Sequence, residues 1–504
     1  MKRRTVKRIL TYVRPYRAAF AASCASALLY VLFTLLGPVF TGRAIDNILG
    51  PGQVDLRGVL HYLALLGISV LLAAASQWVM NVCTRKISSR ASNDMRGEAF
   101  RVLNRTPLKY IDGHTHGDII SRMVNDADLV AEGLLQGLTQ LLPGVATILG
   151  TLVVMAVLNP VIALVVVLVT PVSIAFAGFV ARRTTGFFKA QSAAQGRLSG
   201  FVNEMVAGQS VVKAFGYEDR CFAQFDAISD ELYDTGLKSV FYSSVTNPGT
   251  RFVNAIVYAA VGVIGAISAI GGSITVGQLS CFLTYANQYT KPFNEVTGVL
   301  TQLQTAVASA ERLFAVIDEP TERPDAPDAL APTACGGRVT ASHVDFAYVP
   351  AVPLIEDFNL DVMPGQRIAI VGPTGCGKTT LINLLMRFYD VDGGCIRIDG
   401  QRIDEVKRDS LRAQFGMVLQ DTYLFEGTIA ENIAYGKPQA DRAEIIAAAK
   451  KSGAHEFIIR LNHGYDTRLH ANSNILSQGQ RQLLSITRVL LMNPHILILD
   501  EATS

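Results

Sequence analysis

The chain has 504 residues, too many for one ordinary domain. Apolar residues make up 50% of it and charged residues only 17%, below the roughly 25% that is usual in soluble proteins. The net charge of +3 is too small to indicate a nucleic-acid partner, and the seven cysteines form no C-x-x-C pair, which argues against a zinc site or a disulfide framework. Charged residues are scarce mainly in residues 1–300, whereas residues 337–504 have the composition of a soluble α/β domain.

Six apolar stretches are long enough to cross a bilayer, whose core needs about 20 residues of helix. They cover residues 18–40, 57–82, 134–158, 160–181, 250–272 and 275–298. Asn159-Pro160 separates the third from the fourth, and Gly271-Gly272-Ser273 separates the fifth from the sixth. We therefore expect an all-α membrane domain of six helices in residues 1–318.

The distribution of Lys and Arg predicts which ends of these helices face the cytosol. Seven of these residues lie in 1–17, eight in 83–132 and seven in 182–241, whereas 41–56 contains only Arg43 and the two tight turns contain none. By the positive-inside rule, both termini and the two long loops are cytosolic. The expected location is the inner or plasma membrane, spanned several times and with the C-terminal domain in the cytosol.

The two long loops, 83–132 and 182–241, exceed ordinary connections, which are about 4–6 residues long. Both show the apolar periodicity of helices. We expect the membrane spans to continue as helices beyond the bilayer. The alternative, two small independent domains, is disfavoured because neither loop contains strand-like runs or clusters of turn residues.

Some polar residues fall within the fifth and sixth spans, where ionisable groups are costly and usually face a bundle interior or water. They are Arg251, Asn254, Asn287, Gln288, Lys291, Asn294 and Glu295. One interpretation is that they line a substrate cavity. The alternatives are that the ends of the spans are misplaced, or that Lys291 and Glu295 form an i,i+4 pair.

Residues 319–336 contain four prolines and no periodicity, which predicts a linker before the domain of residues 337–504. Beyond it, strand and helix patterns alternate, which favours an α/β domain with a largely parallel sheet. The expected strands are 367–372, 395–400, 415–420 and 495–500, the first and last of them buried, and the expected helices are 378–389, 443–453 and 477–492.

The sequence GPTGCGKTT, residues 372–380, follows an expected strand and opens an expected helix, as a phosphate-binding loop does. Its glycines allow backbone N–H groups to surround phosphates, and the helix N-terminus adds positive charge. Lys378 is expected to neutralise phosphate oxygens and Thr379 to bind magnesium. The nucleotide-binding candidates here are Gly372, Pro373, Thr374, Gly375, Cys376, Gly377, Lys378, Thr379 and Thr380.

Two carboxylates end the apolar stretch ILILDE, residues 496–501. Asp500 is placed to hold Mg²⁺, and Glu501 to orient and polarise the water that attacks ATP. Gln420, which ends the strand FGMVLQ, could reach the magnesium and sense the γ-phosphate. Together these residues predict ATP hydrolysis with Glu501 and Gln420 as catalytic residues and Thr379, Gln420 and Asp500 at the metal.

A second candidate phosphate receptor precedes the acidic strand. In the sequence LSQGQ, Ser477 has the appearance of a helix N-cap, and its hydroxyl, the Gly479 backbone and Gln480 begin a helix. A single subunit does not need two receptors for the same γ-phosphate. Two chains arranged head to tail use both receptors, because each ATP then lies between the Lys378 loop of one chain and the Ser477 helix of the other.

Tyr348 is a candidate for stacking on adenine, with a surface aromatic as the alternative, and Phe346 is a lesser candidate two residues away. His114 and His116 suggest a metal site, but no Cys or third His accompanies them, so a solvated turn is the preferred interpretation.

Together these motifs resemble the ATP-binding-cassette (ABC) exporters, specifically half-transporters in which six spans of the exporter type precede one P-loop ATPase domain. GPTGCGKTT resembles Walker A, LSQGQ the signature and ILILDE Walker B, while Gln420 and Tyr348 resemble the Q-loop and the A-loop aromatic. Residues 111–130 resemble the first intracellular coupling region, and 202–219 the second-loop pattern.

The chain departs from the family pattern in two places. Where the family often has Glu-x-Gly before the signature, this chain has Ala471-Asn472-Ser473, which puts the usual contact to a coupling helix in doubt. All eight histidines precede Glu501, so none matches the family's switch histidine. The second departure predicts a C-terminally truncated sequence or an incomplete gene model, with the ATPase domain incomplete after Walker B.

The resemblance implies ATP-driven export by alternating access, with ATP and Mg²⁺ as cofactors and an identical or related half-transporter as partner. The substrate classes left open are an amphiphilic drug-like compound, a lipid or a peptide. The alternative function is a non-hydrolysing or regulatory subunit of a heterodimeric transporter, with the chain inactive alone. A soluble ATPase acting on nucleic acid is excluded by the six spans.

Overall fold

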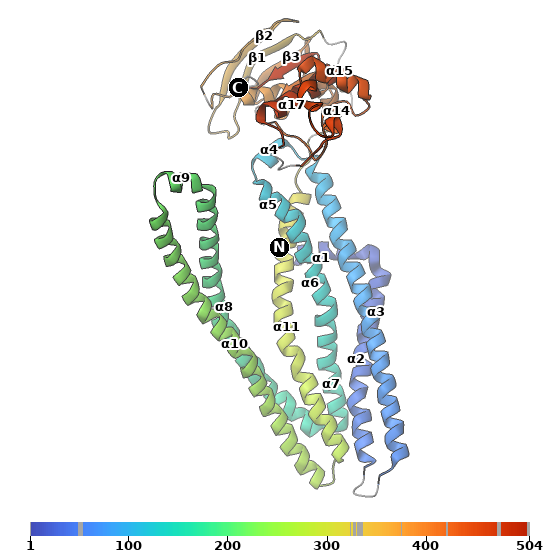
Figure 1. Ribbon diagram of the computed structural model, residues 1–504. Coiled ribbons are helices and arrows are strands. Elements are labelled where there is room, and N and C mark those ends of the chain that lie inside the picture. The colour runs from blue at the N-terminus through green and yellow to red at the C-terminus, as the bar shows by residue number, and fades with distance from the viewer. Residues whose placement is uncertain are drawn as a thin grey trace. The chain divides into compact units, whose positions relative to one another are not determined.

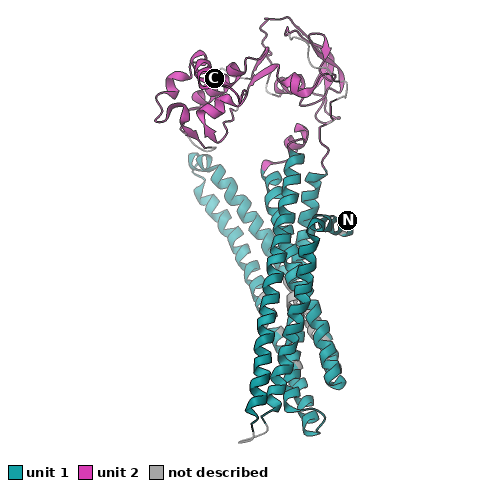
Figure 2. Ribbon diagram, turned by 90° about the vertical axis from the view of Figure 1, so that its right-hand side faces the viewer, with its two compact units in different colours: residues 1–103, 117–318 teal, residues 104–116, 319–504 magenta. Residues whose placement is uncertain are grey.

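The computed structural model describes residues 2–48, 54–322, 324–325, 329, 336–373, 375–419, 422–470 and 475–500, with some helical side chains in 165–297 left out. It divides into two compact units, shown in Figure 2. Unit 1 comprises residues 1–103 and 117–318, and unit 2 comprises residues 104–116 and 319–504. The second unit thus includes a short segment that lies, in sequence, inside the first.

Unit 1 is entirely helical in its described part, and six long helical stretches make up most of it (Figure 1). Three helices carry the predicted spans 160–181, 250–272 and 275–298: α8 (Pro160–Ala207), α10 (Glu218–Ile270) and α11 (Val276–Ile317). The other elements are α1 (Lys2–Val13), η1 (Arg14–Tyr16), α2 (Arg17–Asp46), α3 (Leu56–Leu103), α5 (His116–Ser121), η2 (Arg122–Asp126), α6 (Ala127–Gln136), η3 (Gly137–Leu141), α7 (Leu142–Leu158) and α9 (Gln209–Ala214).

Three stretches of described helix are long and apolar enough to cross a membrane: Arg3–Asp46, Leu56–Leu103 and His116–Leu158. They contain the first three predicted spans. The two predicted tight turns are also present. Asn159 ends one helix and caps the next, because its side-chain oxygen accepts hydrogen bonds from the Val161 and Ile162 amides. Thr275 caps α11 in the same way, reciprocally with Gln278.

The helical continuation of the spans is confirmed. The helices α3 and α8 have 48 residues each and α10 has 53. At 1.5 Å per residue these lengths are about 70–80 Å, more than twice the bilayer core of about 30 Å. The helices α8 and α10 run as a pair joined at α9, so no separate domain occupies the second long loop (Figure 1).

Two packing features hold unit 1 together. Asp126 is 3% exposed, and both of its carboxylate oxygens accept hydrogen bonds from the guanidinium of Arg312 on α11. At the other end of α11, Asp46 accepts hydrogen bonds from the Thr275 hydroxyl at 2.7 Å and the Gly277 amide at 2.8 Å. The helices α2 and α11 meet so closely there that an added Cβ on Gly277 would lie 2.0 Å from the Gly42 carbonyl oxygen.

Unit 2 contains a four-stranded antiparallel sheet in the order β2-β1-β3-β4. Its strands are β1 (Val339–Phe346), β2 (Ile355–Val362), β3 (Gly393–Ile398) and β4 (Gln401–Arg402). The sheet packs with α12 (Lys378–Leu385) around a buried core that includes Val344, Leu384 and Ile396. Leu108 of α4 (Leu108–Asp112) packs against the same core.

The rest of unit 2 is mainly helical. The strands β5 (Phe415–Val418) and β8 (Ile496–Leu499) form a parallel pair, and β6 (Gly427–Thr428) pairs with β7 (Arg468–Leu469) antiparallel. The helical elements are α13 (Arg408–Arg412), α14 (Ile429–Ala434), α15 (Arg442–Ser452), α16 (His455–Ile458), η4 (Gly464–Asp466) and α17 (Gln478–Met492).

The first residues of the proline-rich linker lie against unit 2. Asp325 accepts a hydrogen bond of 2.7 Å from Arg408, and Glu322 forms an ion pair of 3.2 Å with Arg412. The Glu322 amide also donates to the Arg105 carbonyl at 2.7 Å. The segment of residues 104–116 and the start of the linker therefore meet within unit 2.

Three sequence expectations for this unit are wrong in the described residues. The pairing is mostly antiparallel. The connection between β1 and β2 is short, and a short connection can join only antiparallel strands, because parallel strands need a longer crossover. Residues 367–372 form no strand and are exposed, since an apolar run becomes a strand only where a neighbour pairs its backbone, and no described segment does. The strand β8 is only half buried, because alternate side chains, Leu497 and Leu499, are each 54% exposed.

Candidate nucleotide-binding site

The loop of residues 372–380 turns through two glycines into the first turn of α12. Gly375 and Gly377 have φ of +87° and +95°, a conformation that glycine adopts without strain, and Gly377 is the N-cap of the helix. An added Cβ on Gly372 would lie 2.5 Å from the Cys376 Sγ, so the Cys376 side chain would have to move. The free amides of the helix N-terminus therefore lie at this loop, the arrangement that binds anions in many proteins.

The cation of the site lies against the same loop. The Lys378 ammonium group donates hydrogen bonds to the Gly372 carbonyl at 2.8 Å and the Pro373 carbonyl at 3.1 Å. The positive charge is thus held beside the helix N-terminus. A phosphate group that replaces these carbonyls would receive both the cation and the amides.

A hydroxyl and a carboxylate converge next to this cation. The Thr379 hydroxyl donates to the Asp500 carboxylate at 3.4 Å. Asp500 is positioned by strand pairing, because its amide donates to the Val418 carbonyl at 2.9 Å and extends the β5–β8 ladder by one residue. Oxygens of these two types at this spacing fit Mg²⁺, which takes oxygen ligands at about 2.0–2.1 Å.

Tyr348 lies directly after β1 and is 38% exposed. Its hydroxyl donates to the Thr380 hydroxyl at 3.2 Å, which ties the ring to the first turn of α12. Its ring meets those of Phe346 and Tyr389 edge to face, with centroids 5.0 and 5.1 Å apart. Phe346 is 5% exposed, so its ring is enclosed in the core and only Tyr348 presents an accessible face.

Ser477 is the N-cap of the 15-residue helix α17. Its hydroxyl accepts a hydrogen bond from the Gln480 amide at 3.3 Å, and the Gln480 side chain accepts one from the Ser477 amide at 2.9 Å. Ser477 and Gly479 are exposed, and no atom lies within 4 Å of the position of a Cβ on Gly479. This helix N-terminus is therefore open to a ligand from outside.

The structure does not bring the two phosphate receptors together within this chain. Among the described residues, no hydrogen bond or ion pair joins Ser477, Gly479 or Gln480 to residues 372–380. Thr374, Gln420 and Glu501 lie outside the described residues, as do Ala471, Asn472 and Ser473.

The coupling region expected at 111–130 contributes one contact to unit 2 that the sequence did not indicate. The Tyr389 hydroxyl donates to the Asp112 carboxylate at 2.6 Å. Burial raises the pKa of the Tyr389 phenol, and the hydrogen bond to Asp112 raises it further. His114 follows in the turn after α4, where a ring nitrogen is bonded to the Tyr110 carbonyl at 2.8 Å.

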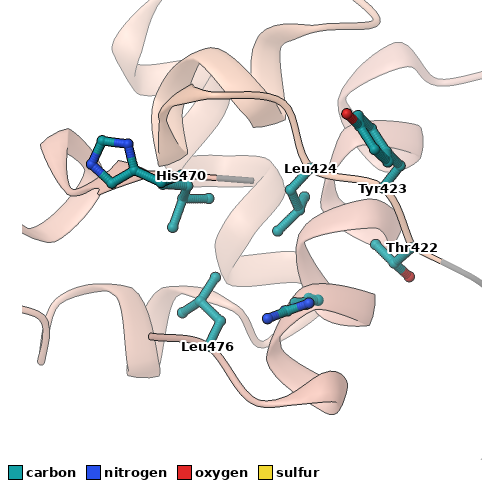
Figure 3. A pocket seen from close by; sticks show the side chains of 7 residues that line it. Thr422, Tyr423, Leu424, His470 and Leu476 are labelled. Atoms are coloured by element: carbon teal, nitrogen blue, oxygen red, sulfur yellow. The ribbon is translucent and has the colours of Figure 1, made fainter. Parts of the chain in front are cut away.

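A small cavity of about 130 Å³ lies beside the start of α17 (Figure 3). It is lined by Thr422, Tyr423, Leu424, Leu469, His470, Leu476 and Arg481. It separates the segment after Gln420 from the residue before Ser477.

Comparisons with known proteins cover both units. A family model described as the ABC transporter transmembrane region matches residues 20–293, and one described as ABC transporter matches residues 355–504. A "Fatty acid ABC transporter ATP-binding/permease protein" of Mycobacterium bovis is 40% identical over 459 residues, 90% of this chain and 72% of the relative. The "Uncharacterized ABC transporter ATP-binding protein YfiC" of Bacillus subtilis is 37% identical over 99% of this chain and 82% of its own.

A solved structure of a bacterial Atm1-family ABC exporter with ATP bound superimposes with a TM-score of 0.77. It is 28% identical and covers 97% of this chain and 86% of its own. Because the family models and these relatives cover both units, the chain belongs to the ABC transporters: it is a half-transporter of the exporter type that couples ATP hydrolysis to transport across a membrane.

Proposed function

We propose that the protein exports an amphiphilic compound as a dimer of half-transporters, each of which completes the ATP site of the other. The observation that carries this proposal is the separation of two exposed phosphate receptors on unit 2. Lys378 and Thr379 lie with Asp500 at one helix N-terminus, and Ser477 lies at another with no described contact to them. A second chain, identical or related, supplies the missing half of each site.

Each residue has a defined part in the proposed site. Lys378 and the loop amides bind the β- and γ-phosphates, and Tyr348 stacks on the adenine. Thr379 and Asp500 hold Mg²⁺, which neutralises phosphate charge and orients the γ-phosphate when bound. The remaining assignments, Glu501 orienting the attacking water and Gln420 sensing the γ-phosphate, rest on the sequence motifs, since both residues lie outside the described part.

The coupling between ATP and transport is assigned to the segment of residues 104–116. Leu108 packs into the core of unit 2 and Asp112 is bonded to Tyr389, while the chain on both sides continues into helices of unit 1. ATP drives the cycle by binding the closed pair of ATPase domains better than the open pair, which shifts the membrane helices between their two states. Hydrolysis then resets them.

The proposed orientation places both termini and unit 2 in the cytosol and is supported by the distribution of Lys and Arg. The substrate is proposed to be an amphiphile because the bacterial relative named for fatty acids is 40% identical. Export, rather than import, is supported by the similarity to a solved exporter over nearly the whole chain.

The test is ATP hydrolysis and substrate movement by the protein in reconstituted vesicles, compared with Glu501→Gln. We expect the variant to bind ATP and to lose nearly all hydrolysis and transport, because the attacking water is no longer polarised. Equal hydrolysis rates would remove the assignment of Glu501. If the unmodified protein binds ATP without hydrolysing it but stimulates a related half-transporter, the alternative of a regulatory subunit is correct.

A further inference from the structure

One face of α11 carries a polar stripe within the membrane span. Thr284, Asn287 and Lys291 are exposed at helical spacing, whereas Tyr285 and Tyr289 between them are buried. A polar stripe toward lipid is costly, so such a stripe normally faces water or a polar ligand. Beside it, the side-chain oxygen of Gln288 is buried and has no hydrogen-bond partner among the described residues.

A second exposed cation, Arg251, lies at nearly the same level on the neighbouring helix. The helices α10 and α11 pack antiparallel, and the Gly262 and Gly265 positions of α10 face Leu283 and Leu279 of α11. Arg251 is eleven residues before Gly262, and Lys291 is eight residues after Leu283. Measured from these contacts, the offsets of the two cations along the helices differ by about three residues, which is about 5 Å along the helix axis.

Both cations lie in the cytosolic half of the bilayer core. Lys291 is fifteen residues from the start of α11 at Val276, about 22 Å, and Arg251 is nineteen residues from the end of α10 at Ile270, about 28 Å. The hydrocarbon core is about 30 Å thick. Counted from the outer ends of the helices, Arg251 therefore lies near the cytosolic edge of the core and Lys291 about 8 Å inside that edge.

The charge in this part of the two helices is mostly basic. From Thr235 to Asn294 the sequence contains Lys238, Arg251 and Lys291 but no Asp or Glu. None of the ion pairs between described residues includes Arg251 or Lys291. The first carboxylate after Lys291 is Glu295, one turn further on, and its side chain is outside the described part.

We infer that Lys291 and Arg251 bind the anionic headgroup of an acyl amphiphile that enters from the inner leaflet. The inference rests on the proposed export function and narrows its substrate to anionic amphiphiles. Lys291 is the main specificity residue, because it belongs to the polar stripe. Carboxylate and phosphate headgroups share this chemistry, and the probes below separate them from neutral and cationic headgroups.

The test uses the protein in phosphatidylcholine nanodiscs and three fluorescent probes with one dansylated undecanoyl chain: the free acid, its methyl ester and its choline ester. We expect the acid to bind best and the choline ester worst. Lys291→Met and Arg251→Gln should each weaken acid binding about tenfold and leave ester binding unchanged, the size expected for one charge-assisted hydrogen bond. A probe with the same chain and a phosphate monoester in place of the carboxylate, compared with the acid, separates the two anionic headgroups.

Two further variants serve as controls. Lys238→Met makes the same change on the cytosolic extension of α10 and should not alter any affinity, whereas Lys291→Arg should retain the preference for the acid. Equal binding of acid and ester by the unmodified protein overturns the inference. An equal loss of affinity for both probes in Lys291→Met also overturns it, because that result indicates that Lys291 only extends its charge to the membrane surface.

The outcome is separable from that of the proposed function. ATP-dependent translocation of the ester as well as the acid, abolished by Glu501→Gln, would keep export and discard the headgroup site. Charge-selective binding that Lys291→Met abolishes, without ATP-dependent translocation of any probe, would keep the site and discard export.

Discussion

The Tyr389 hydroxyl donates a 2.6 Å hydrogen bond to the carboxylate of Asp112, a residue 277 positions earlier in the chain. The same tyrosine ring meets Tyr348 edge to face, and Tyr348 is bonded in turn to Thr380 at the phosphate-binding loop. A continuous set of contacts thus links the proposed adenine-binding ring to the short helix α4. This arrangement is suited to report the state of the nucleotide site to the membrane helices.

Replacing Tyr389 by Phe should weaken this coupling without removing ATP binding. The ring contacts remain, but the Asp112 carboxylate loses its donor, a change worth about 1 kcal/mol at a partly exposed position. We expect basal hydrolysis to persist and its stimulation by substrate to fall severalfold, as measured in vesicles. Tyr435→Phe is the control, because Tyr435 stacks on Phe425 and its hydroxyl forms no hydrogen bond with any described residue. Equal stimulation in both variants would contradict the coupling role.

The same contact predicts a response to alkaline pH. Burial and Asp112 raise the pKa of Tyr389 above its ordinary value near 10. Below pH 10 the phenol is protonated in both the folded and unfolded states, so its contribution to stability is fully present. Above pH 10 the unfolded chain ionises first, and the contribution is lost as the pH approaches the folded pKa. The stability advantage over Tyr389→Phe should therefore be constant from pH 7 to 9 and shrink beyond pH 10 in urea unfolding.

The buried carboxylate of Asp126 gives a stability prediction for unit 1. Arg312→Ala leaves Asp126, 3% exposed, without its charged partner. Complete burial of an unpaired charge costs about 3–5 kcal/mol, and the half-exposed Arg312 reduces that to about 2–3 kcal/mol. We expect lower thermal stability in detergent, partly restored by Asp126→Asn in the same chain. Arg197→Ala, which breaks the exposed pair with Glu231, should have little effect.

Sequence patterns predicted the helices well because their causes are local. Asn159 and Thr275 cap helices through their own neighbours, and the same holds for Ser477. The sheet of unit 2 was predicted poorly because pairing is not local. The β2 strand was missed although Phe358, Leu360 and Val362 alternate with polar residues as in a half-buried strand. Residues 367–372 were misassigned because an apolar run does not indicate which segment pairs with it.

The candidate site shows the same division. The Lys378 loop and the Ser477 cap follow from their motifs, and the approach of Thr379 to Asp500 follows from both lying at strand or helix ends. The contact of Asp112 with Tyr389 was not predicted, because Asp112 lies in the expected coupling region but Tyr389 belongs to no motif, and the two residues are 277 positions apart in the chain.

The close approach of α2 and α11 predicts a strong effect of one added methyl group. In Gly277→Ala the new Cβ would lie 2.0 Å from the Gly42 carbonyl oxygen, so the helices must separate and the Asp46 hydrogen bonds to Thr275 and Gly277 weaken. We expect a loss of about 1–3 kcal/mol, seen as a lower melting temperature in detergent. Gly298→Ala, on the same helix with no atom within 4 Å, should be neutral or slightly stabilising.

Whether each ATP site is shared between two chains can be decided by complementation of Lys378→Ala and Ser477→Glu. If the sites are shared, a dimer with one variant in each chain keeps one intact site, since both defects fall in the other. A dimer of the double variant with an unmodified chain then has no intact site. Sites confined to single chains give the reverse pattern.

The measurement uses dimers purified through two different affinity tags, so that only mixed dimers are assayed. We expect trapping of labelled ATP at about half the unmodified level in the first pairing and close to none in the second, because tight closure requires both receptors on one nucleotide. The geometry supports this outcome, since the Ser477 helix N-terminus is exposed and makes no described contact with the loop of its own chain. A retained signal in the second pairing alone would assign both receptors to one chain and remove the dimer from the proposed mechanism.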